Sequence, residues 1–274
     1  MLFSDLNSTL LAIAKIASIG IIINSIEQLS RRRFFQSNHL FSWSTISRFR
    51  SSLAHAKFIF PLLSKLLDYP NVLWLIIARI LAAIVLFCFS NNYWLSSMAI
   101  WWIYISGLLL FNIRVIIRTG YSVFLQAIFV TLSLQRLVPN SELTELFCIW
   151  AIAIQCCLVY FENGITKLKE VEWRNGKAIL RVLNNPIYIS SISNWSVFKN
   201  HKFNRLLSWS VIMFELTFPL ALFGGNIGLI VLLSLGFTFH LINSWALGLG
   251  TFFWVFIAAY PAIIYCNRWL VEYL

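Results

Sequence analysis

The sequence predicts an all-α membrane protein, a polytopic bundle of about eight transmembrane helices. Of the 274 residues, 59% are hydrophobic and only 11% are charged, whereas soluble domains contain about 45–50% apolar and about 25% charged residues. The apolar residues are grouped in runs of about 18–22, the length of helix that crosses a ~30 Å hydrocarbon core. Twelve Trp and nine Tyr support this prediction, because amphipathic rings favour the membrane–water boundary. We therefore expect an integral, multi-pass membrane protein.

Eight apolar runs define the expected spans in chain order. They cover about residues 8–25, 71–90, 93–113, 121–138, 144–166, 206–223, 227–245 and 247–266. Because lipid offers the backbone no hydrogen-bond partner, each run is expected to form a helix. Residues 52–68 are too short and too charged to cross, so an amphipathic helix lying in the membrane interface is expected there. The whole chain, residues 1–274, is predicted to form one transmembrane domain.

The positive charge lies mainly between the spans. The formal net charge is +11, and most of the 21 Lys and Arg residues fall in the connections from span 1 to 2, 3 to 4 and 5 to 6. Basic loops beside anionic lipid account for this charge, so no nucleic-acid partner is expected. By the positive-inside rule these connections are cytoplasmic and both termini are outside. The five cysteines show no metal-like spacing, and no metal site is expected.

Ionisable residues inside the spans are the sharpest functional signal, because each costs several kcal/mol unless it is paired or solvated. The candidates are Lys15, Arg79, Glu162, Lys167, Glu215 and His240. Lys15 and Arg79 could reach the interface or pair with a structural partner. Glu215 lies four residues before Pro219, so it could satisfy a carbonyl region that this proline frees. His240 could hydrogen-bond a neighbouring helix.

Two groups of polar residues share a helix face. Tyr160, Gly164 and Lys167 lie at positions i, i+4 and i+7 of the fifth span. Gly164 allows another helix or a ligand to approach closely. Lys167 lies where the apolar run gives way to polar sequence, and a lysine shielded from water there could act as a proton acceptor. His240 and Asn243, at i and i+3, could bind a polar group within the bundle.

Two segments carry a resemblance to a known family. The first has the pattern Y-F-x-x-G-x-x-K-L over residues 160–168, followed by Trp173 and Gly176. The second has the pattern F-H-x-x-N-S over residues 239–244, and Glu215 lies between the two. Together these segments resemble the HTTM family, the membrane domain of vitamin K-dependent gamma-carboxylase and its bacterial relatives.

The resemblance is best over about residues 155–262 and implies chemistry for Lys167. In the carboxylase, the second of two adjacent lysines in this motif is the proposed base that deprotonates vitamin K hydroquinone. Lys167 matches that position, and Thr166 stands where the first lysine would be. The resemblance also puts Lys167 on the extracytoplasmic side, whereas the charge count puts its loop inside. The implied catalytic residues are Lys167 and His240, and the implied substrate-binding residues are Tyr160, Gly164, Glu215 and Asn243.

Three functions remain open. The first is maturation or export of a secreted peptide, as in the similar sporulation-delaying protein B group of small HTTM-containing membrane proteins. This is favoured because the chain stops at Leu274, where the carboxylases continue into a large soluble domain. The second is a carboxylase-like enzyme with vitamin K hydroquinone or another quinone as cofactor. The third is a transporter or membrane scaffold. The expected partners are the lipid bilayer and a small secreted peptide, and the expected location is a bacterial cell membrane.

Overall fold

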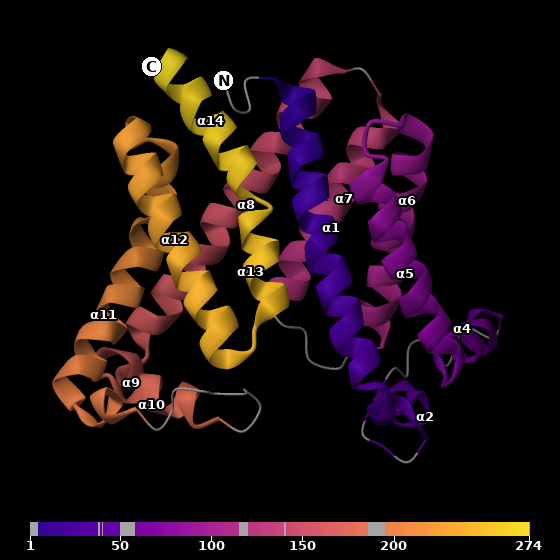
Figure 1. The fold of residues 1–274 in the computed structure, drawn as a ribbon, viewed down its shortest axis with the longest axis horizontal. Coiled ribbons are helices and arrows are strands. Elements are labelled where there is room, and N and C mark those ends of the chain that lie inside the picture. Colours follow the sequence, from indigo (N-terminus) through magenta and orange to yellow (C-terminus); the bar gives the residue numbers. More distant parts are fainter. Residues whose placement is uncertain are drawn as a thin grey trace. The chain divides into compact units, whose positions relative to one another are not determined.

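The computed structural model describes residues 5–37, 39, 41–49, 58–114, 120–139, 141–185 and 195–273. Every regular element among these residues is a helix, which confirms the predicted all-α class (Figure 1). The chain divides into two compact units. Unit 1 comprises Met1–Ile13 and Glu142–Leu274, and unit 2 comprises Ala14–Ser141. The first helix, α1 (Leu6–Ser30), contributes residues to both units.

Seven of the described helices are long and apolar enough to cross a membrane. They are Leu6–Ser30, Asn71–Cys88, Tyr93–Phe111, Glu142–Lys169, His201–Leu222, Gly225–Leu247 and Gly250–Glu272. Each coincides with a span predicted from the sequence, so the protein is an integral, multi-pass membrane protein. The eighth predicted span, about residues 121–138, corresponds to α7 (Gly120–Leu137). Gln126, Gln135 and Arg136 make this helix less apolar than the other seven.

Unit 2 is built on a helical hairpin. α5 (Asn71–Cys88) packs against α6 (Tyr93–Gly107) across a short turn, and α6 packs in turn against α7. The side chain of Asn92 caps α6 by accepting a hydrogen bond from the backbone N–H of Leu95 at 3.0 Å, as asparagine commonly does at a helix start. A π-helical segment, η3 (Leu108–Ile113), continues α6.

Short helices precede this hairpin. α2 (Trp43–Ile46) contacts α4 (Ile59–Leu67) where the indole N–H of Trp43 donates to the Ser64 hydroxyl at 2.9 Å. α4 is amphipathic, with Leu63 and Leu67 buried while Ile59 and Leu62 are exposed. This agrees with the amphipathic helix predicted over residues 52–68, of which residues 52–57 lie outside the described part of the chain.

Arg114 ties these short helices to the end of the hairpin. Its Nε donates to the carbonyl of Leu67 at 3.2 Å, and its Nη2 donates to the carbonyl of Phe41 at 2.8 Å. The guanidinium also lies 4.2 Å from the ring centroid of Phe35. Burial lowers the pKa of Arg114 to about 10, and the charge of Asp68 partly offsets this shift. Arg114 is therefore still a cation at neutral pH, and it holds the segment through charge-assisted hydrogen bonds.

Unit 1 is organised around α8 (Glu142–Lys169), which packs against α11 (His201–Thr217) and α14 (Tyr260–Tyr273). Its first turn carries two acidic residues and its last turn two basic ones, an arrangement that complements the helix dipole. The side chain of Asn200 caps α11 by accepting from the N–H groups of Lys202 and Phe203. α11 then gives way at Phe218 to a 3-10 turn, η5 (Phe218–Leu222), which contains Pro219.

The polar connection from α8 to α11 contains two short helices, α9 (Val171–Arg174) and α10 (Lys177–Leu183). In Figure 1 both lie at the end of unit 1 where α8 finishes and α11 begins. Gly176 joins them with a positive φ of 83°, a conformation that favours glycine. A Cβ at this position would also lie 2.5 Å from the backbone nitrogen of Arg205. Gly176 therefore fixes the connection against α11.

Two further helices complete unit 1. α12 (Gly225–Leu247) ends at Gly248, whose φ of 71° forms a left-handed cap. α13 (Gly250–Ile257) follows and packs back against α12. The unit thus brings α8, α11, α12 and α14 together, and these are the helices that carry the candidate site.

Candidate functional site

The predicted polar face of α8 packs against α11. Gly164, at the centre of this face, is buried, and a Cβ there would lie 3.0 Å from both the backbone nitrogen and the side chain of Leu216. Replacing the glycine hydrogen with a methyl group would therefore press on the backbone of α11. Gly164 allows the close helix approach expected from the sequence, and this approach brings the flanking residues Tyr160 and Lys167 up to α11.

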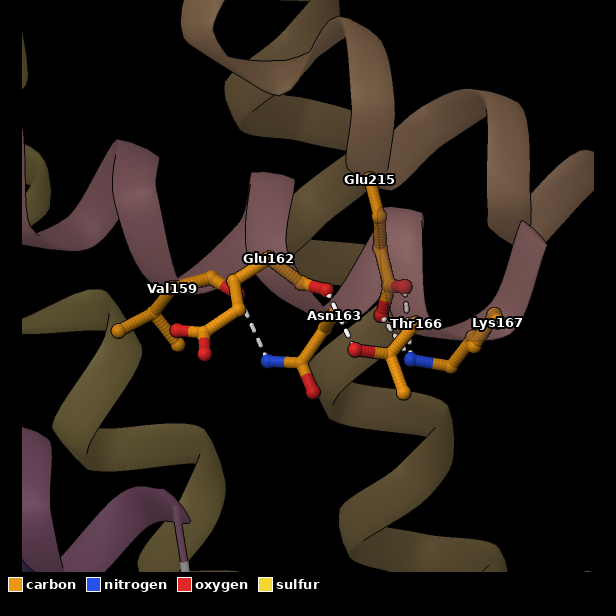
Figure 2. Close-up of polar contacts among 6 residues, drawn as sticks. All are labelled: Val159, Glu162, Asn163, Thr166, Lys167 and Glu215. Carbon is orange, nitrogen blue, oxygen red and sulfur yellow. Dashed lines mark hydrogen bonds and ion pairs between the residues drawn. The ribbon is translucent and has the colours of Figure 1, made fainter. Parts of the chain in front are cut away.

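Lys167 and Glu215 form an ion pair across this contact. Figure 2 shows the Lys167 ammonium between α8 and α11, where Nζ donates to the Glu215 oxygens at 2.8 and 2.7 Å. The two side chains are 16% and 5% exposed, respectively. The ammonium also lies 5.2 Å from the ring centroid of Trp173, within the range of a cation–π interaction. Glu215 thus has a cationic partner rather than the backbone near Pro219 that the sequence suggested.

The polar neighbours of Lys167 on α8 bond to their own helix. The Asn163 side chain donates to the carbonyl of Val159 at 2.7 Å, and the Thr166 hydroxyl donates to the carbonyl of Glu162 at 2.9 Å (Figure 2). Thr166 stands where the carboxylases have their first lysine. Its hydroxyl group is occupied within the helix, so Lys167 carries the contact to α11.

A second polar contact joins α8 to α12. The Tyr160 hydroxyl lies 2.5 Å from Nε2 of His240, and both side chains are buried. Aromatic rings surround the pair: Tyr160 stacks on Phe218 with a centroid distance of 3.7 Å, and His240 stacks on Phe256 at 4.3 Å. Tyr160 and His240, both ionisable, are thus hydrogen-bonded to each other in an apolar, aromatic environment.

The Tyr160–His240 contact includes two residues that the sequence did not single out, Gly236 and Tyr260. A Cβ on Gly236 would clash with the Tyr260 hydroxyl and lie 3.3 Å from the Tyr160 hydroxyl, so both hydroxyls point toward this glycine. The Tyr260 hydroxyl interacts with the Tyr160 hydroxyl, and within the described part of the chain Nδ1 of His240 has no hydrogen-bond partner. Tyr260 lies in an apolar run, and its position before Pro261 was the only available signal.

Four of the six expected site residues form two contacts on α8. Lys167 with Glu215 makes one, Tyr160 with His240 makes the other, and Gly164 lies between them on the helix. Asn243 is half-buried one turn beyond His240 on α12 and takes no part in either contact. Trp173, which the sequence placed in the motif without a role, joins Lys167.

The Lys167–Glu215 contact can store and move a proton. In an environment of low polarity, a charged group is costly and tends to become neutral. An ammonium that donates directly to a carboxylate can do so by passing its proton along the hydrogen bond, which leaves a neutral amine. Such an amine is a base, and Lys167 is the more exposed of the two partners. The arrangement thus has the elements of acid–base chemistry at a largely buried site.

Comparison with known families covers this whole region. Residues 132–269, half of the chain, match the family model described as HTTM domain. The match extends from within α7 to α14 and includes both polar contacts, Lys167 with Glu215 and Tyr160 with His240. No curated protein and no solved structure shows significant similarity to the chain. The motif resemblance seen in the sequence is confirmed, and the chain belongs to the HTTM-domain family.

Proposed function

We propose that this HTTM protein is a membrane enzyme whose Lys167–Glu215 pair performs a proton transfer during the maturation or export of a secreted peptide. One observation carries the proposal: a lysine and a glutamate from two packed helices share two hydrogen bonds while both are largely shielded from solvent. Ionisable residues at such positions in membrane proteins commonly mark proton relays or substrate sites.

Glu215 is the group that would prepare Lys167 to act as a base. While Glu215 is a carboxylate, it holds Lys167 as an ammonium, which cannot accept a proton. Transfer of one proton from Nζ to a Glu215 oxygen gives a neutral amine beside a neutral carboxyl group. The amine then removes a proton from the substrate and becomes an ammonium again. Because Lys167 is more exposed than Glu215, a substrate would meet the lysine first.

The surroundings of the pair suit an aromatic, membrane-soluble proton donor. The rings of Tyr160, Phe214 and Phe218 pack against one another where α8 meets α11 and η5, and Phe214 directly precedes Glu215. The resemblance to the vitamin K-dependent carboxylases suggests a reduced quinone, which would supply an acidic hydroxyl. In this proposal Trp173 stabilises the ammonium form of Lys167. Tyr160 and His240 orient the hydroxyl groups of the reduced quinone.

A second function in the same peptide pathway has its own support. The bidentate geometry of the ion pair is also what a purely structural clamp between α8 and α11 requires. In that case the protein is a non-catalytic maturation or export factor, and Lys167 holds helices in register. The two functions differ in whether the amine of Lys167 ever has to be free of its proton.

Quinone epoxidation separates the two functions. Purified protein would be supplied with reduced menaquinone or reduced vitamin K under oxygen, and epoxide would be measured for the native chain and for Lys167→Ala, Glu215→Gln and Lys169→Ala. Lys169 is the matched control, because it is exposed and lies two residues further along α8. We expect epoxide from the native protein and Lys169→Ala, and background levels from the other two. If the folded native protein produces none, the base chemistry on a quinone is rejected and the non-catalytic function remains.

A further inference from the structure

A second buried cation lies in unit 2, outside the proposed site. Arg79 is 0% exposed in the middle of α5, and Nε, Nη1 and Nη2 of its guanidinium have no hydrogen-bond partner within the described part of the chain. No carboxylate among these residues forms an ion pair with it. Among the described residues, the guanidinium of Arg79 is thus fully buried without an ion-pair or hydrogen-bond partner.

The contacts around Arg79 compensate its charge only in part. The guanidinium lies 4.9 Å from the ring centroid of Phe111, and Tyr121 is close enough to interact electrostatically. A phenol is uncharged at neutral pH, so Tyr121 supplies no counter-ion. Gly107 lies one helical turn before Phe111, and the side chain of Gln126 occupies the space that a side chain at Gly107 would fill. Among the described residues, Oε1 of Gln126 is also buried without a hydrogen-bond partner.

The energetic balance points to a missing anion. A cation–π contact offsets only part of the cost of burying an ion, which stays large even after the surroundings relax. Five N–H donors without acceptors add to this cost, because buried polar groups are ordinarily hydrogen-bonded. The described residues of unit 2 thus contain a prepared cation without its counterpart.

The chemistry and depth of Arg79 define the counterpart. A planar guanidinium binds carboxylate or phosphate through two parallel hydrogen bonds. Arg79 lies eight residues after Asn71 and nine before Cys88, which places it roughly 12–14 Å from either end of the helix. A ligand whose oxyanion reaches that depth needs an apolar body that lipid or helices can surround.

We propose that Arg79 is the binding residue of an oxyanion site in unit 2, and that the site takes the carboxylate or phosphate of an amphiphilic ligand. This site is independent of the Lys167–Glu215 pair and of the function proposed for it. Because Arg79 is fully enclosed, entry of the ligand requires α5 to separate locally from its neighbours. Bidentate hydrogen bonds to the guanidinium would then offset the cost of opening.

Two anions with a single alkyl chain can probe the site in the purified protein in a neutral detergent. Dodecanoate carries the carboxylate, dodecyl phosphate carries the phosphate, and dodecanol is the uncharged reference. We expect each anion to raise the thermal unfolding temperature of the native protein to a saturating value, while dodecanol does not. Arg79→Met should raise the half-saturating concentration of the anions at least tenfold, and Arg79→Lys should raise it by a smaller factor. Arg32→Met, a change at an exposed arginine, should leave it unaltered.

Native mass spectrometry distinguishes the sources of the oxyanion. A retained fatty acid or peptide identifies a carboxylate ligand, and a retained phospholipid identifies a phosphate ligand; either should be lost from Arg79→Met. The proposal is overturned if the native protein binds neither anion saturably, or if Arg79→Met binds them as the native protein does. If Arg79→Met does not fold, two comparisons still test the proposal. The first compares the anions with dodecanol on the native protein, and the second compares anion binding by the native protein with that by Arg79→Lys.

Discussion

Lys167 in unit 1 and Arg79 in unit 2 are both cations on candidate membrane-spanning helices, but their surroundings differ. Lys167 donates two hydrogen bonds to Glu215 and keeps 16% of its side chain exposed. Arg79 is 0% exposed and has no hydrogen-bond acceptor among the described residues, where the face of Phe111 and the electrostatic contact with Tyr121 offset its charge only in part. One charge is balanced inside its own unit, and the other is not.

This difference separates two ways in which a membrane protein can use a buried charge. A balanced pair such as Lys167–Glu215 can hold helices together or exchange a proton without any other molecule. An unbalanced charge such as Arg79 costs stability until an anion arrives, which is the behaviour of a binding site. The two units should therefore respond with opposite signs when their charges are removed.

Removal of Glu215 should have the largest effect. Glu215→Ala leaves the Lys167 ammonium largely buried without its carboxylate, and breaking a buried pair in this way costs about 3 kcal/mol. The free energy of unfolding, measured by denaturation in detergent, should fall by that amount. Glu162→Ala, which removes an exposed carboxylate from α8, should stay near the native value. An equal response of the two variants would show that the Lys167–Glu215 pair contributes no stability.

The helix approach at Gly164 should have the next largest effect. In Gly164→Ala the new methyl group meets the Leu216 backbone at 3.0 Å, and overpacking of this kind costs about 1–2 kcal/mol. Separation of α8 from α11 should also weaken the coupling between Lys167 and Glu215 in a double-mutant cycle. Gly228→Ala is the matched control, because a Cβ there meets nothing within 4 Å. A loss of stability in the control but not at Gly164 would contradict the close approach.

Replacement of Arg79 should act in the opposite direction. Arg79→Met removes an uncompensated charge and retains much of the side-chain volume, so in neutral detergent the free energy of unfolding should be unchanged or higher by about 1 kcal/mol. The same denaturation assay measures it. A loss as large as that of Glu215→Ala would mean that Arg79 has a partner within the chain, and the contrast between the two units would disappear.

The sequence was sufficient for the long apolar helices because the apolar runs and their polar ends are local features. The face shared by Tyr160, Gly164 and Lys167 was predictable for the same reason, since helical spacing alone determines it. The HTTM motif identified the family that residues 132–269 match. These predictions needed no knowledge of which helices pack together.

The partners of the charges were not predictable, because they depend on that packing. Glu215 lies 48 residues after Lys167, and its nearer neighbour Pro219 suggested a different role. The sequence indicates that burying the Arg79 charge is energetically costly. That its guanidinium has no hydrogen-bond partner among the described residues is visible only in the packed structure of α5, α6 and η3. Tyr260 has no polar neighbour in sequence, and only the fold brings its hydroxyl to Gly236 beside Tyr160.

The smallest expected effect concerns Trp173 and tests how fully the Lys167 charge is balanced. Its ring centroid lies 5.2 Å from the Lys167 ammonium, and such a contact contributes about 0.5–1 kcal/mol. A double-mutant cycle with Trp173→Leu and Lys167→Met should give a coupling energy of that size, because the cycle cancels the packing lost with the indole. Trp74→Leu, at an exposed tryptophan of α5, should show no coupling with Lys167→Met. If Trp173 also shows none, Glu215 alone balances the ammonium, and the role proposed for the indole in supporting the protonated lysine is wrong.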